Sequence, residues 1–226
     1  MGKNLSFFGF ALIAIALLAG CKGCENNVDT LHFDEKAVID IPEQYIEPLV
    51  TNLDEYFKTM SEDRFEDYVE LVYPPVFVTD SSKALSIKMM REFLDMGVRN
   101  VTESFKLVYL SPLVEDSTQY YSLVMMNVKH KIIFGEAYAG DPAELTPMIR
   151  SQYGTESYKY DPVKREYEIS TISRMYAITD KKDIRFTFLN DQYLHSRDLS
   201  NLLTYDVVFP LKQYEEEQNK RLKAGQ

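Results

Sequence analysis

Several motifs that would identify a catalytic activity, a metal site or a cofactor are missing from this 226-residue chain. It has three histidines, His32, His130 and His195, and no two of them lie close enough in sequence to form the ligand pair that metal sites usually show. There is no glycine loop to cradle phosphate and no G-x-S-x-G nucleophile motif. We therefore predict no metal site and no cofactor, and the sequence identifies no catalytic residue.

A second long apolar run is missing as well. The only such run, Phe7–Ala19, follows Lys3 and consists of apolar or small residues. A bilayer-spanning helix needs roughly 20 apolar residues, whereas the core of a secretory signal needs about 7 to 15. The run therefore predicts a cleaved signal peptide over residues 1–20.

The apolar run ends in a short motif with a known meaning. The residues Leu18-Ala19-Gly20-Cys21 resemble the lipobox of bacterial lipoproteins. This resemblance implies that Cys21 receives a thioether lipid and becomes the mature N-terminus. Two or more acyl chains would anchor the protein durably to a membrane.

Two other interpretations of this end are weaker. Gly2 and Ser6 fit an N-myristoylation pattern, but a cytosolic acylated protein would not continue into a signal-like segment. Cys21 and Cys24 form a C-x-x-C, but no second such pair exists and no helix starts there. Lys22 after the lipidated cysteine favours the outer membrane over the inner membrane of the cell envelope.

The charge balance excludes one class of partner. Removal of Lys3 with the leader leaves 24 of the 25 Lys and Arg residues against 35 Asp and Glu, a net charge of −11. An acidic domain gains nothing from counterion release, so we expect no nucleic acid to bind. Membrane affinity would come from the lipid anchor alone.

The mature chain is long enough for one substantial core. We predict a polar tether over residues 21–40, a single α+β domain over 41–210, and a charged, solvated helical tail over 211–226. Glu216 with Lys220, and Glu217 with Arg221, are spaced i,i+4 and support the tail helix.

Helices are predicted in the first half of the domain. Apolar residues recur at spacings of three and four from Ile46 to Met60, which indicates an amphipathic helix. Ser61 is expected to cap a second helix that stops before Tyr73-Pro74-Pro75, and a third follows Ser81 and Ser82, with Gly97 as its left-handed stop.

Strands are predicted in the second half, where β-branched residues and tyrosine are frequent. The expected strands are 105–110, 120–134, 156–160, 167–179 and 184–189, and a short helix starting at Asp141-Pro142 or at Thr146-Pro147 interrupts them before Gly154. Helices followed by a curled antiparallel sheet give an α+β fold in which the sheet wraps over the helices.

Over residues 42–189 the chain resembles the nuclear transport factor two-like superfamily. The residues that carry this resemblance are Phe65-Glu66-Asp67-Tyr68-Val69, Tyr73-Pro74-Pro75-Val76-Phe77, Tyr153-Gly154, Tyr160-Asp161, Met175-Tyr176-Ala177-Ile178-Thr179-Asp180 and Phe186-Thr187-Phe188-Leu189. The resemblance implies a cone-like fold that ketosteroid isomerases, dehydratases and many non-enzymatic binding domains share.

Enzymes on such a fold set an aspartate base beside a proton-donating tyrosine or acid. Asp67 and Tyr68 are adjacent on a helix and point about 100 degrees apart, so they cannot form this pair. Our expectation is a non-catalytic domain that binds an apolar small molecule or an envelope protein, with self-association as a homodimer left open. The alternative is a lyase or isomerase with a small hydrophobic substrate in the cone pocket.

The two hypotheses differ in what they require between helices and sheet. A lyase needs a desolvated acid with a raised pKa bonded to a tyrosine there. A binding module is favoured if side chains close this space, and the expected set is Phe65, Val69, Phe93, Met125 and Phe188. In that case the function would lie on the outer surface of the sheet or in self-association.

Overall fold

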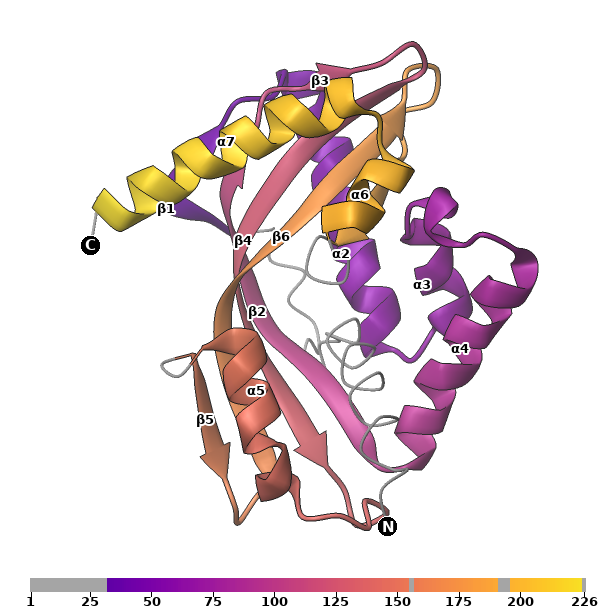
Figure 1. Cartoon of the computed structure of the whole chain (residues 1–226), viewed down its shortest axis with the longest axis vertical. Helices are drawn as coiled ribbons and strands as arrows, with labels where there is room; N and C mark the ends of the chain where they lie inside the picture. Colours follow the sequence, from indigo (N-terminus) through magenta and orange to yellow (C-terminus); the bar gives the residue numbers. More distant parts are fainter. Residues whose placement is uncertain (1–31, 155–156, 191–195, 225–226) are drawn as a thin grey trace.

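A strongly curled sheet of seven strands, close to half of a barrel, organises the fold (Figure 1). The structure is a computed structural model and describes residues 32–154, 157–190 and 196–224. The strands are β1 (His32–Ile39), β2 (Val98–Leu110), β3 (Val114–Glu115), β4 (Gln119–Phe134), β5 (Tyr158–Asp161), β6 (Glu166–Asp180) and β7 (Phe186–Asn190). The order is β1-β2-β4-β6-β5, with β3 beside β4 and β7 beside β6. All pairs are antiparallel except β1 with β2, so the α+β prediction is confirmed.

Three helices precede the sheet: α2 (Glu43–Ser61), α3 (Phe65–Leu71) and α4 (Asp80–Asp95). The apolar stripe of α2 is buried at Leu49, Leu53 and Phe57, as the spacing predicts. Thr79 caps α4 by accepting from the Ser82 amide at 3.1 Å, and Gly97 adopts a left-handed φ of 76° just beyond α4. The predicted left-handed stop is therefore confirmed.

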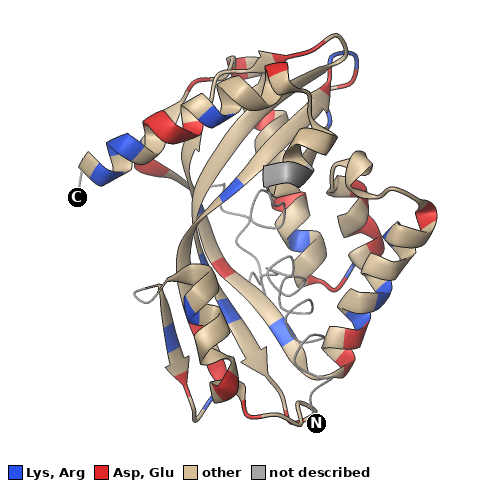
Figure 2. Ribbon diagram, viewed as in Figure 1, with Lys and Arg blue, Asp and Glu red and all other residues tan. Residues whose placement is uncertain are grey.

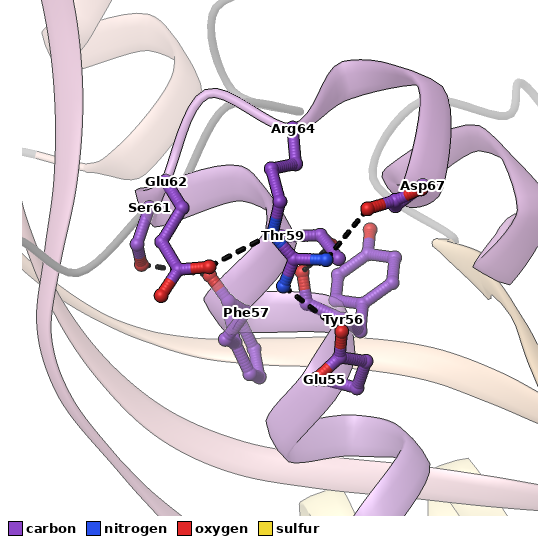
Figure 3. Close-up of polar contacts among 8 residues, drawn as sticks. All are labelled: Glu55, Tyr56, Phe57, Thr59, Ser61, Glu62, Arg64 and Asp67. Carbon is purple, nitrogen blue, oxygen red and sulfur yellow. Dashed lines mark hydrogen bonds and ion pairs between the residues drawn. The ribbon is translucent and has the colours of Figure 1, made fainter.

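The cap predicted for the second helix is wrong. Ser61 is the last residue of α2, and its hydroxyl donates to the Phe57 carbonyl at 2.8 Å. The corner between α2 and α3 is held instead by Arg64, whose guanidinium binds Glu55, Glu62 and Asp67 at 2.9, 2.8 and 2.6 Å (Figure 3). Arg64 is the residue preceding α3, and its planar guanidinium has enough donors to bind all three carboxylates at once.

Other helices follow or interrupt the strands. They are α5 (Thr146–Tyr153), α6 (Ser196–Leu202) and α7 (Tyr205–Ala224), with 3₁₀ turns η1 (Pro74–Val76) and η2 (Pro142–Leu145). Both start signals predicted near Asp141 are used, because Asp141 caps η2 and Thr146 begins α5. Gly154 ends α5 with a φ of 86°, as predicted.

Residue alternation along β4 defines the two faces of the sheet. Even-numbered residues such as Val124, Met126 and Val128 face α2 to α5, and we call this the inner face. Odd-numbered residues face the other way, and on this outer face Tyr121, Leu123 and Met125 pack with residues of α6 and α7. The first half of β4 is thus covered on both faces.

The rest of the outer face carries charge. Asn127 and Lys129 are exposed, and Lys131 is surrounded by carboxylates of Glu103, Glu166 and Glu168 at 2.7, 3.5 and 3.6 Å. The helix α7 crosses the upper part of the sheet and does not reach this lower part (Figure 1). Figure 2 shows Lys and Arg side by side with Asp and Glu on the lower strands.

Two predictions at the ends of the domain need correction. His32–Ile39 belongs to the predicted tether, but it forms β1 and pairs in parallel with β2. The tail from residue 211 is helical as predicted, yet it is not simply solvated, because Leu211, Glu215 and Gln218 are buried against the sheet. The i,i+4 charge pairs belong to the opposite side of α7 and do not reveal this packed side.

The signal peptide over 1–20, Cys21 and the tether up to residue 31 lie outside the described residues. Among the described residues, no helix has the length and apolar content needed to cross a bilayer.

Candidate functional site

Between the helices and the upper inner face, side chains form a continuous apolar core. Phe65, Val69, Phe93 and Phe188 belong to this core and are each at most 6% exposed. Four of the five residues expected to close the space therefore do so. Met125 is the exception, because its odd position on β4 places it on the outer face, in the cluster with α7.

Farther down the inner face, two polar side chains interrupt the apolar surface. His130 on β4 and Thr102 on β2 are direct cross-strand partners, and they are 6% and 0% exposed. Side chains of directly opposed residues lie on the same face, about 5 Å apart at their Cβ atoms. The two residues therefore form one buried polar position.

One polar atom of each side chain lacks a hydrogen-bond partner among the described residues. Nδ1 of His130 and Oγ1 of Thr102 are buried and have no hydrogen-bond partner within the described parts of the chain. An unsatisfied buried polar group costs about 1–3 kcal/mol of stability. A pair of such groups at one position is unusual in a native protein and needs an explanation.

The surroundings of His130 are apolar and aromatic. Val128 and Ile132 flank it along β4, and Ile169 of β6 is its other cross-strand partner. The ring of Tyr153, at the end of α5, meets the imidazole edge to face, with ring centroids 5.4 Å apart. We call His130, Thr102 and Tyr153 the inner polar site.

Burial controls the protonation of this site. It lowers the pKa of His130 to about 4 and raises the pKa of Tyr153 well above its usual value. Both groups are therefore neutral at pH 7, and His130 is a weak base. An effective general base has a pKa near the working pH, so this imidazole is better suited to hydrogen bonding than to proton abstraction.

The prediction that His130 is half exposed is wrong. It rests on the neighbours Lys129 and Lys131, which point to the outer face, whereas His130 shares the face of Val128 and Ile132. The alternation of apolar residues from Val124 to Phe134 is the signal that places His130 inside. The sequence contains no comparable signal for Thr102, because β2 carries a bulge between Thr102 and Ser104.

An acid bonded to a tyrosine does occur, but on the outer side of the sheet. The Tyr121 hydroxyl donates to Asp116 at 2.6 Å and lies 3.0 Å from the side-chain oxygen of Gln119, which accepts from the Tyr73 hydroxyl. Although partial burial opposes it, the hydrogen bonds from Tyr121 and from the amides of Thr118 and Gln119 keep the pKa of Asp116 below its usual value. Asp116 thus stays ionised and shapes the turn before β4.

The pair considered from the sequence, Asp67 and Tyr68, diverges as helical geometry requires. Asp67 binds Arg64, while the Tyr68 hydroxyl lies buried at 2.9 Å from that of Tyr56 (Figure 3 shows Asp67 and Tyr56). Asp54 on α2 is the one acid in the described residues with a raised pKa, caused by burial. It makes no hydrogen bond to a tyrosine within those residues.

Within the described residues no three His, Cys, Asp or Glu side chains are grouped so that they could hold a metal ion. Cys21 lies outside those residues, and so does His195. The comparisons with known proteins add no identity, since no family model, curated protein or solved structure matches the chain.

Proposed function

We propose that the chain is an exported lipoprotein, anchored through Cys21, whose domain binds an apolar small molecule and does not catalyse a reaction. The observation that carries the binding part is the inner polar site, where Nδ1 of His130 and Oγ1 of Thr102 are buried and have no hydrogen-bond partner among the described residues. A ligand with a hydrogen-bonding group would complete such a pair.

Two observations favour binding over the lyase or isomerase alternative. The acid–tyrosine pair at Asp116 and Tyr121 has an ionised acid and lies on the outer side of the sheet. The upper inner face, where a cone-like enzyme would place its substrate, is filled by core side chains. We retain the cone-like family as part of the proposal for the fold.

Binding of an envelope protein or self-association would need a free sheet surface. On the upper outer face, α6 and α7 already cover Leu123 and Tyr176. The remaining outer face presents Lys129, Lys131 and Glu168. The filled upper core would on its own favour the outer surface or self-association, as expected above, but the unpartnered atoms of His130 and Thr102 lie on the inner face. We therefore propose an apolar small molecule as the occupant.

The anchor is tested by substitution of Cys21. We expect Cys21→Ala to abolish incorporation of a palmitate analogue and to leave the precursor uncleaved or the protein released from membranes, because the lipid is the strong attachment. Cys24→Ala is the matched control and should label like the wild type. Incorporation of the palmitate analogue that persists in Cys21→Ala would contradict the proposed lipid anchor.

The compartment is tested separately. With Lys22 after the lipidated cysteine, we expect the protein in the outer-membrane fractions of a sucrose gradient. Recovery in the inner membrane alone would refute this, without bearing on the function of the domain.

A further inference from the structure

The inner polar site has a specific hydrogen-bonding capacity. A neutral imidazole presents one donor and one acceptor nitrogen, and a threonine hydroxyl presents one donor and two lone pairs. A ligand hydroxyl has one hydrogen to donate to Nδ1 of His130, in the tautomer that leaves this nitrogen bare, and lone pairs that accept from Oγ1 of Thr102. The donor and acceptor capacity of a single neutral hydroxyl therefore matches what the two unpartnered atoms need.

The charge around the site argues against an ion. Lys129 and Lys131 lie on the other face of the same strand, and Lys131 is already bound by carboxylates. A buried carboxylate or ammonium without a counter-charge is strongly disfavoured. The ligand group that meets His130 is thus uncharged.

The walls of the site define the rest of the molecule. Val128, Ile132 and Ile169 are each at most 4% exposed and offer aliphatic contacts around His130. Tyr153 adds an aromatic ring at the end of α5. Such a lining with a few polar groups is typical of sites for apolar molecules.

We propose that the inner polar site holds the hydroxyl of a small apolar alcohol or phenol, hydrogen-bonded by His130 and Thr102. The inference rests on the proposed binding function and names the class of its ligand and the two residues that recognise it. Tyr153 is a wall of the site and contributes its ring.

The test uses three matched probes and the full mature chain in detergent. They are p-cresol, with a neutral hydroxyl, toluene, without a polar group, and p-toluate, with a charged one. The readout is the ¹⁵N and ¹³C signals of the His130 imidazole, assigned by their loss in His130→Leu. We expect p-cresol to shift these signals with at least tenfold higher affinity than toluene or p-toluate.

The hydroxyl of Thr102 is tested by Thr102→Val, which keeps the shape of the side chain and removes its polar atom. We expect at least a tenfold loss of p-cresol affinity, and no loss of thermal stability without ligand, since an unsatisfied group is removed. Thr171→Val is the control, because Thr171 lies on the same face of β6, opposite Val128. Should Thr102→Val not fold, Thr102→Ser retains the hydroxyl and must retain the binding.

The outcomes distinguish the hydroxyl inference from the proposed binding function on which it rests. Equal affinity for the three probes, a preference for p-toluate, or no response at His130 would overturn the hydroxyl inference. A co-purified molecule that binds wild type and Thr102→Val equally would also overturn it, while leaving the proposed binding function in place.

Discussion

The two halves of β4 differ in what covers their outer face. From Tyr121 to Met126 the strand is buried on both sides, under α7 on one face and under α2 to α4 on the other. From Asn127 to Phe134 only the inner face is buried, and the outer face carries exposed Lys129 and the ion-paired Lys131. The comparison shows that one strand can supply core in its first half and a polar site in its second.

The largest contrast is expected from truncation of the outer face. Leu123→Ala should lower the free energy of unfolding by about 3 kcal/mol, because a fully buried leucine under α7 is replaced by a cavity. Lys129→Ala, on the same face in the lower half, should change it by no more than about 0.5 kcal/mol. Urea unfolding measures both, and similar losses would contradict the division of the strand.

Acid should act on the lower half through His130. Its pKa is about 4 in the folded protein and about 6.5 when unfolded, so the unfolded chain takes up a proton first as the pH falls. The stability present above pH 6.5 is therefore lost progressively towards pH 4.

The contribution of His130 to the acid sensitivity can be measured with the variant His130→Leu. Between pH 7 and pH 4.5 the wild type should lose on the order of 2 kcal/mol more than His130→Leu, which removes the titrating group and leaves the carboxylates. Urea unfolding at the two pH values measures the difference. Equal losses in the two proteins would mean that His130 is not buried as described.

A smaller contrast concerns ion pairs. In the upper half, Glu215 of α7 is 9% exposed and is bound by Arg174 and, at 2.9 Å, by Lys212. Arg174→Met should destabilise the protein by about 1–2 kcal/mol, because a buried carboxylate loses one of its partners and Arg174 itself is partly solvated. Displacement of α7 should be seen as faster amide exchange in Val207–Gln218.

Lys131→Met is the counterpart in the lower half. Glu103 and Glu168 are exposed to water and Glu166 keeps Lys164 at 3.6 Å, so the loss should be about 1 kcal/mol or less. A larger loss of stability in Lys131→Met than in Arg174→Met would contradict the expectation that ion pairs stabilise the upper half more than the lower half.

The fold could be predicted from the sequence where periodicity is strong. The stripe of α2 and the stop at Gly97 follow from local spacing and backbone geometry, and both are confirmed. The strand β1 could not be predicted, because HFDEKAVI alternates poorly and gains its pairing only from distant β2. The packing of α7 against the sheet could not be predicted either, because the buried side of this helix includes the polar residues Glu215 and Gln218.

The inner polar site could not be predicted from the sequence, for a different reason. It depends on two residues of neighbouring strands that meet only through the register of β2 with β4. The alternation along β4 would have placed His130 inside, but no feature of the sequence pairs it with Thr102. A bulge one residue from Thr102 makes that register hard to foresee.

Native mass spectrometry of the protein purified from its own membranes shows whether the domain carries an apolar molecule. We expect the mass of the chain from Cys21 with its lipid, plus a further neutral mass that dissociates on collisional activation. That extra mass should be depleted in Thr102→Val and retained in Thr171→Val. Lipidated protein without any dissociable mass, in every preparation, would mean that the domain does not bind an apolar molecule.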